Sequence, residues 1–231
     1  MKRFYRQAGI IPAEEGCNIA LDGKPAKTPA KRNLKVPTAA LAAAIATEWN
    51  SQQGDIRPAG MPLTQLANTA IDRVMPQRDL IVQQVADYAG TDLVCYRATR
   101  PPALTARQQA VWQPLVDWAV LRYDAPLEIT AGVVPVAQSP VSLRAFAAAV
   151  AEHDDFALTA LSVATAACGS LVIALALVEG RLNAEEAFAA SQLDESFQIE
   201  AWGEDAEQAQ RRRALLGDIM AAARFLRLLR A

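Results

Sequence analysis

Short apolar runs separated by turn residues mark the first 37 residues of the chain. The runs cover Phe4–Ile11, Gly16–Leu21 and Leu34–Val36, and each is short enough to form one strand. Asp22-Gly23 follows the second run, and both residues tolerate the positive φ angles that a tight hairpin requires. The pattern therefore predicts a small antiparallel sheet at the amino-terminal end.

Apolar residues three to four positions apart dominate the rest of the chain, which is typical of amphipathic helices. Thr38 is suited to cap the first helix, and Asn183 with Glu186 has the spacing of a capping box. Pro114 falls inside an expected helix and predicts a kink or a break there. The expected helices cover, in order, residues 38–54, 63–74, 76–90, 105–123, 142–152, 183–203 and 204–229, and residues 127–136 are expected to form a loop or a short strand.

These patterns place the chain in the α+β class and predict two domains. Residues 1–76 are expected to form a small domain that combines an N-terminal antiparallel β-sheet with helices. Residues 77–231 are expected to form a larger, all-α helical domain. A chain of 231 residues is long enough to supply a core for each.

Residues 156–178 form a run of 23 residues without a charge, long enough to cross a membrane as one helix. Polar residues such as Thr159 and Ser162 dilute its first half, and its flanks carry no excess of Lys and Arg and no Trp or Tyr. A helix that is apolar on all sides also occurs at the buried centre of a bundle. We therefore expect a buried helix or helix pair here, and no stable membrane insertion.

The composition leaves few groups for catalysis. Alanine accounts for 48 residues and aromatic residues for 6 %, so much of the 52 % hydrophobic fraction is small, helix-forming side chains. One histidine, His153, and three widely spaced cysteines exclude a multi-histidine metal site and a disulfide framework. The sequence contains no phosphate-binding loop, dinucleotide fingerprint or G-x-S-x-G elbow. We expect no catalytic residues, no metal and no cofactor.

The first residues and the cysteines bear on location. No apolar stretch follows Met1–Arg6, so no secretory signal is expected. Cys17, Cys95 and Cys168 are typical of buried thiols in a reducing compartment. A mature protein of the bacterial cytoplasm fits both observations, and so does an organelle protein whose transit peptide has been removed.

Charge is segregated along the chain although the net charge is only −2. Residues 1–35 have a balance of +5, residues 179–207 one of −8 and residues 211–230 one of +5. The near-neutral total argues against a nucleic-acid partner. The acidic stretch allows two interpretations: a solvated face that complements the basic one, which we favour, or a surface that recruits a partner.

Several segments, in order from residue 2 to about residue 207, are similar to one family. They are Lys2-Arg3-Phe4-Tyr5, Leu21-Asp22-Gly23-Lys24-Pro25 with Thr28-Pro29, Glu48-Trp49, Met61-Pro62-Leu63-Thr64 running to Thr69-Ala70-Ile71-Asp72, Thr91-Asp92-Leu93-Val94-Cys95-Tyr96-Arg97, Ser170-Leu171 to Glu179-Gly180, and Glu195-Ser196-Phe197-Gln198-Ile199-Glu200-Ala201-Trp202-Gly203-Glu204. Together they resemble the F-type ATP synthase assembly chaperones that bind the free α subunit of the catalytic head.

The resemblance implies a protein without enzymatic activity. It would bind the unassembled α subunit and keep it soluble until the β subunit replaces the chaperone. The resemblance also implies a small α/β domain before a larger helical one, and the mitochondrial matrix as the location of eukaryotic relatives. We expect the free protein to be a monomer.

The resemblance further points to the carboxyl-terminal motif as the partner-binding site. An acidic residue of the family's E-x-x-F-Q stretch is tied to function, and Glu195 matches it here. Its neighbours in the expected site are Asp194, Phe197, Gln198, Glu200, Trp202 and Glu204. Phe197 and Trp202 are expected more readily in the core than at a contact. Many relatives continue with a valine-acid-histidine stretch, whereas Asp205–Gln210 contains no histidine, so no role for that residue is carried over.

Two other hypotheses stay open at this point. The protein could be a small-molecule enzyme with a carboxylate-based site that pairs Glu48 with Asp72 or Glu195 with Glu200. A deep pocket around a carboxylate of raised pKa would favour the enzyme, and a shallow acidic surface the chaperone. Alternatively, the run at residues 156–178 could attach an assembly factor to a membrane.

Overall fold

The computed structural model describes residues 2–132 and 134–231. Contacts divide the chain into two compact units. The first comprises residues 1–78 with 154–160 and 224–231, and the second comprises residues 79–153 with 161–223. The predicted α+β class is confirmed, since a small antiparallel sheet with helices begins the chain and the remainder is mostly helical. The proposed domain boundary after residue 76 stays a prediction.

The sheet of the first unit is built around one central strand. Its strands are β1 (Ala8–Pro12), β2 (Cys17–Leu21), β3 (Lys24–Pro25) and β4 (Lys35–Val36). Strand β2 pairs antiparallel with each of the other three. The β2–β3 turn places Asp22 at φ +49° and Gly23 at φ +77°, as its two residue types predict. The Asp22 carboxylate also accepts the backbone N–H groups of Arg6 and Gln7, so it fixes the start of β1.

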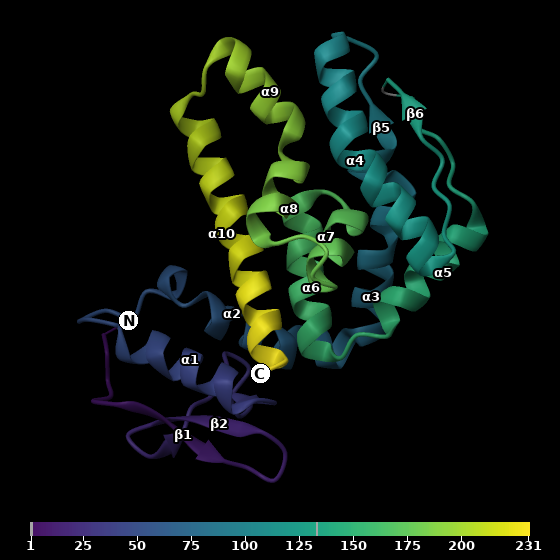
Figure 1. The fold of residues 1–231 in the computed structure, drawn as a ribbon. Coiled ribbons are helices and arrows are strands. Elements are labelled where there is room, and N and C mark those ends of the chain that lie inside the picture. The colour runs from purple at the N-terminus through teal and green to yellow at the C-terminus, as the bar shows by residue number, and fades with distance from the viewer. Residues whose placement is uncertain (1, 133) are drawn as a thin grey trace. The chain divides into compact units, whose positions relative to one another are not determined.

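Helix α1 (Ala39–Asn50) packs against β1, β2 and β4 (Figure 1). The Thr38 hydroxyl caps it by accepting the Leu41 N–H at 3.1 Å, as expected. The helix turns Leu41 and Ile45 into the core of the first unit, where both are fully buried. It ends at Asn50, before the expected stop at Gly54.

The first unit continues with short helices. They are η1 (Pro58–Gly60), α2 (Pro62–Thr69), a π-helical turn η2 (Ala70–Val74) and η3 (Met75–Gln77). The Glu48 carboxylate of α1 accepts the N–H groups of Leu63 and Thr64, both at 2.8 Å, and the Thr64 hydroxyl at 2.7 Å. A buried carboxylate of α1 therefore caps α2, whose Met61 N-cap supplies no side-chain hydrogen bond.

The second unit is built from helices with one pair of two-residue strands. Its elements are α3 (Arg78–Ala86), η4 (Asp87–Thr91), η5 (Leu93–Cys95), β5 (Tyr96–Arg97), α4 (Pro102–Tyr123), β6 (Thr130–Ala131), α5 (Pro140–Ala151), most of α6 (Asp155–Cys168), α7 (Leu171–Val178), α8 (Ala184–Ser191), α9 (Leu193–Trp202) and most of α10 (Ala206–Leu229). Strands β5 and β6 pair in parallel. Of the loop or short strand predicted for residues 127–136, the structure shows a short strand, β6, at Thr130–Ala131.

The uncharged run at residues 156–178 forms two helices rather than one. Gly169, at φ +63°, ends α6, and the Ser170 hydroxyl caps α7 by accepting the Ile173 N–H at 3.0 Å. All eight residues of α7 are buried, and α7 packs against α4 and α8. Among the described residues, no helix combines the length and the apolarity needed to cross a membrane.

Helix α4 runs without a break through Pro114, so of the predicted kink or break the break is wrong. The contacts on both sides of the proline explain its continuity. Trp112 is fully buried and its indole N–H donates to the Ala190 carbonyl at 2.8 Å, and Leu115 is buried one turn later. Tertiary packing of this kind offsets the loss of one helical hydrogen bond.

Candidate functional site

The candidate site lies on α9. Helix α8 directly precedes α9, and a glycine ends α9. Asn183 and Glu186 form the predicted capping box, because the Asn183 side chain accepts the Glu186 N–H and Glu186 accepts the Asn183 N–H. Gly203, at φ +84°, ends α9 as expected. Leu193 is the buried residue of α9, and the residues after it are half-buried or exposed. Helix α9 thus has one fully buried residue, and its exposed residues gather toward its carboxyl-terminal end.

A chain of hydrogen bonds holds Asp194 from within the second unit. The Gln108 amide of α4 donates to the Asp194 carboxylate at 2.8 Å and accepts the Ala98 N–H at 2.8 Å. The Arg97 guanidinium donates to the carbonyl groups of Val94 and Gln108 and lies over the Trp112 ring. The motif around Arg97 and the motif around Asp194 are therefore joined through one glutamine.

Asp92, in the same motif as Arg97, caps the buried helix α7. Its carboxylate accepts the Val94 N–H at 3.2 Å and the Val172 N–H at 3.0 Å, and Ser170 adds a side-chain hydrogen bond. Complete burial raises the pKa of Asp92 to about 6, and these hydrogen bonds act in the opposite direction. The role of Asp92 is thus to satisfy the amino-terminal N–H groups of a helix without access to water.

An ion pair joins the outer part of α9 to α4. The Arg107 guanidinium binds both oxygens of the Glu200 carboxylate, at 2.7 and 2.9 Å, and lies 5.2 Å from the centre of the Phe197 ring. The pair lowers the pKa of Glu200 because Arg107 donates to its charged form. Both groups are exposed, so the pair orients α9 more than it stabilises the fold.

Arg212 of α10 performs a similar role on another side of α9. It donates to the Ser196 hydroxyl at 3.1 Å, lies 3.3 Å from the Glu204 carboxylate and covers the Phe188 ring. These contacts agree with the favoured interpretation that the basic stretch complements the acidic one. They involve Glu204 alone among the acids at residues 194–207, so most of the negative charge is left over.

Glu195 and Gln198 keep their polar groups available. Among the residues that the structure describes, the half-buried Glu195 carboxylate has no hydrogen bond or ion pair, and Gln198 is exposed. Glu195 lies between Asp194 and Ser196, which Gln108 and Arg212 hold. Its backbone is thus fixed while its carboxylate is free to bind.

Trp202 is 82 % exposed, so the expectation that it belongs to the core is wrong. Trp202 lies nine positions after the buried Leu193, which rotates it by about 180° around the helix, away from the core. Phe197, only four positions after Leu193, stays near the buried side and is half-buried beneath Arg107. Of the two aromatic residues, one supports α9 and the other projects from it.

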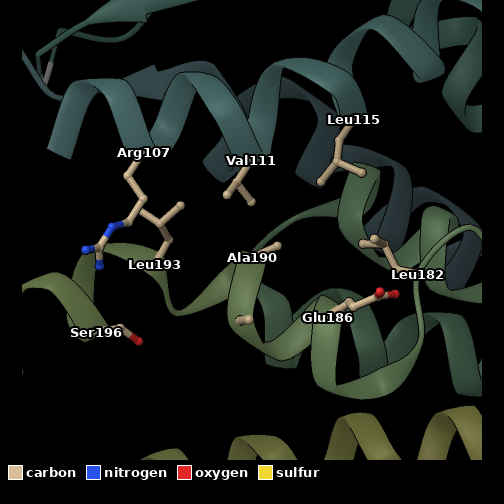
Figure 2. A pocket seen from close by; sticks show the side chains of 9 residues that line it. Arg107, Val111, Leu115, Leu182, Glu186, Ala190, Leu193 and Ser196 are labelled. Atoms are coloured by element: carbon tan, nitrogen blue, oxygen red, sulfur yellow. The ribbon is translucent and has the colours of Figure 1, made fainter. Parts of the chain in front are cut away.

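A groove lies on the buried side of α9, and the sequence does not reveal it. Its volume is about 460 Å³, and its lining residues come from α4, from α8 with the residue before its cap, and from α9: Arg107, Val111, Leu115, Leu182, Glu186, Ala189, Ala190, Leu193 and Ser196. In Figure 2, Val111 and Leu115 of α4 face Ala190 and Leu193, with Arg107 and Ser196 at one end and Glu186 at the other. A second cavity, of about 500 Å³, lies between α8 and α10 around Phe188 and Arg212.

Three of the four carboxylates suggested for an enzyme have structural roles, and Glu195 is the exception. Glu48 caps α2, Asp72 accepts the Thr28 hydroxyl at 2.7 Å and the Ala30 N–H at 2.9 Å, and Glu200 is held by Arg107. The raised pKa of Asp92 belongs to a buried helix cap outside both cavities. Within the described part of the chain, no three His, Cys, Asp or Glu side chains are grouped so that they could hold a metal ion.

Arg107, Gln108 and Arg212 are the site residues that sequence reasoning missed. Arg107 and Gln108 lie in an expected amphipathic helix and carry no local signal that distinguishes them from other polar residues. Arg212 belongs to the basic stretch, whose balance of +5 hinted at a complementary face without naming a residue.

Comparisons with known proteins identify the family. The model of the family described as ATP12 chaperone protein matches residues 2–120. The crystal structure of Atp12 from Paracoccus denitrificans is 45 % identical and has a TM-score of 0.94 over 99 % of this chain and 98 % of that one. The crystal structure of the Atu1473 protein from Agrobacterium tumefaciens is 40 % identical, with a TM-score of 0.91 over 99 % of this chain and 85 % of that one. The mitochondrial protein atp12 of Schizosaccharomyces pombe is 24 % identical over 221 residues, 90 % of this chain and 76 % of that protein.

The family model spans more than half of the chain, and the structural matches extend over nearly all of it. The description of the family names a chaperone rather than an enzyme. The chain therefore belongs to the ATP12 chaperone family, the ATP synthase assembly chaperones that its sequence motifs resemble.

Proposed function

We propose that this protein binds the unassembled α subunit of the F-type ATP synthase head and keeps it soluble until the β subunit replaces it. The outer surface of α9, defined by Glu195, Gln198 and Trp202, is the proposed contact. The observation that carries the proposal is the exposure of Trp202 on the same face of α9 as the Glu195 carboxylate, which has no partner among the described residues, on a helix that α4 and α10 hold in place.

The chemistry of this surface suits a subunit that must later be released. An orphan subunit of a ring exposes a large interface, which aggregates unless another protein covers it. An exposed tryptophan supplies apolar contact area, and the carboxylates around it supply orientation and fast association. A mixed surface of this kind gives moderate affinity, so the β subunit can displace the chaperone.

The remaining residues of the expected site divide between contact and support. Asp194, Phe197, Glu200 and Glu204 are engaged by Gln108, Arg107 and Arg212, so we assign them the role of holding α9. We further propose that the protein acts as a monomer. We propose the bacterial cytoplasm as its location, because the relatives with 45 % and 40 % identity are bacterial.

The test is co-expression with the α subunit, followed by measurement of the soluble fraction of α. Wild-type chaperone is expected to keep α soluble in the absence of β. Glu195→Lys is expected to lower the yield of soluble α several-fold, because it reverses a half-buried carboxylate of α9 that no side chain in the described part of the chain holds. Glu128→Lys makes the same charge change at an exposed position outside α9 and serves as the control.

The outcomes separate the site from the function. If Glu195→Lys folds and supports α as well as Glu128→Lys does, α9 is not the contact. If wild-type protein leaves α insoluble and captures no α from a lysate, the function itself is wrong.

A further inference from the structure

The groove between α4, α8 and α9 is not explained by a contact on the outer surface of α9. Its floor is apolar, from Val111, Leu115, Leu182 and Leu193, and alanine residues of α8 let another chain approach closely. Val111 is 37 % exposed and Ala189 is exposed, whereas Leu115 and Leu193 are buried, so solvent reaches the part of the floor around Val111 and Ala189. A volume of about 460 Å³ is within the range of about 300–1,000 Å³ in which pockets bind ligands.

The rim of this groove is negatively charged. The charge of Arg107 is compensated by Glu200. Glu186 is the acid of the lining, and its carboxylate accepts the Asn183 N–H and is paired with no cation within the described part of the chain. The one base in residues 179–207, Arg181, is turned to the Pro114 carbonyl and the Trp118 ring. An occupant would therefore meet uncompensated negative charge at the Glu186 end of an apolar floor.

We propose that the groove binds an amphipathic helix of the client, with apolar side chains on the floor and a Lys or Arg side chain against Glu186. The proposal rests on the proposed function in taking the α subunit as that client. The lining of α4 extends from Arg107 to Leu115, eight positions or about 12 Å, which matches about two turns of a bound helix. A helix in a groove between helices is a common mode of peptide recognition.

The lining also distinguishes this occupant from a small molecule. Sites for small molecules contain several polar groups that converge on the ligand. Here Figure 2 places the charged side chains Arg107 and Glu186 at opposite ends and only aliphatic side chains between them. An apolar helical face with a cation at one end would pack on the apolar floor and pair its cation with Glu186.

A matched pair of substitutions on one helix tests the groove. Val111→Lys puts a cation into the floor, and Leu121→Lys makes the same kind of change at an exposed leucine of α4 that does not line the groove. Capture of purified α subunit by the full-length chaperone is expected to weaken about tenfold for Val111→Lys and by less than about twofold for Leu121→Lys. Glu186→Gln keeps the capping box and removes the charge, and is expected to weaken capture about threefold at low salt and negligibly at high salt.

A photo-crosslinking residue at position 111, with position 121 as the control, identifies the occupant. The expected product joins position 111 to an α-subunit peptide that has apolar residues three or four positions apart and a nearby Lys or Arg. Three results would overturn the groove proposal while leaving the α-subunit function intact. The first is equal capture of α by Val111→Lys and wild type, and the second is a crosslink from position 111 to a second copy of the chaperone. The third is that no helical peptide derived from α displaces α from the chaperone. If wild-type chaperone captures no α at all, both proposals fall.

Discussion

A single tryptophan shows how exposure separates a functional residue from a structural one. Trp202 is 82 % exposed at the end of α9, where a large apolar side chain gains little from folding. Trp202→Ala is therefore expected to change the free energy of unfolding by less than about 0.5 kcal/mol. The same substitution is expected to weaken α-subunit capture about tenfold or more, as for other tryptophan anchors.

The measurements for Trp202→Ala are urea unfolding followed by circular dichroism and quantitative capture of α. Val134→Ala removes another exposed apolar side chain, one that is 69 % exposed, and is the control. Loss of capture together with a loss of stability of about 2 kcal/mol or more would assign Trp202 to the fold instead.

The raised pKa of Asp92 predicts that the free energy of unfolding depends on pH. Its pKa is about 6 in the folded protein and 3.8 without burial, so the folded state binds the proton more tightly. Its contribution is complete below about pH 4 and is lost as the pH rises through about 6, by up to about 3 kcal/mol. The free energy of unfolding of wild type minus that of Asp92→Asn should thus fall between about pH 4 and about pH 7.

Denaturant unfolding of both proteins at each pH measures this difference. The amide introduced by Asp92→Asn does not titrate, and the contributions of the other titrating groups are common to both proteins and cancel in the difference. A difference that stays constant, or that grows with pH, would mean that the hydrogen bonds from Ser170, Val94 and Val172 outweigh burial.

At the scale of elements, two helices of the first unit are joined by one carboxylate. Glu48 of α1 accepts three hydrogen bonds from Leu63 and Thr64 at the start of α2. Glu48→Gln keeps the shape but leaves a single acceptor oxygen and removes the negative charge at the helix amino terminus. We expect a loss of about 1–3 kcal/mol in the free energy of unfolding.

Thr64 supplies the matched control for this capping contact. Thr64→Ser keeps the hydroxyl that binds Glu48, whereas Thr64→Val removes it, so Val is expected to cost about 1 kcal/mol more than Ser. Equal stability of wild type and Glu48→Gln in chemical unfolding would show that α2 does not need this cap.

Local chemistry explains why several elements could be predicted from the sequence. Asp22-Gly23 specifies its turn, Thr38 its helix cap, and Asn183 with Glu186 its capping box, because each signal acts within a few residues. The break that Pro114 allowed does not occur, because the buried Trp112, anchored to a residue 78 positions away, keeps α4 continuous.

At the scale of the whole molecule, the sequence predicts which stretch of the chain carries the candidate site, but not which distant residues contact it. The resemblance located the stretch around Glu195, and charge counting showed that residues 179–207 carry a balance of −8. Neither shows that Arg107, 93 positions before Glu200, holds α9 or that a groove lies between α4 and α8. Contacts over such separations depend on packing that no local pattern encodes.

The alkylation rate of the buried thiols measures how often the second unit opens. Cys95 and Cys168 lie in the second unit, and burial raises the pKa of each to about 12, whereas Cys17 of the first unit is only half-buried. With an alkylating reagent at about pH 8, one thiol per chain is expected to react quickly and two slowly, and Cys17→Ser should remove the fast phase.

The slow phase then times how often the second unit opens, without any added probe. Rapid alkylation of all three thiols in native buffer would contradict the burial of Cys95 and Cys168. If the alkylation of these two thiols is measured in the presence of a client, its rate shows whether binding an orphan subunit makes the second unit of the chaperone open less often or more often.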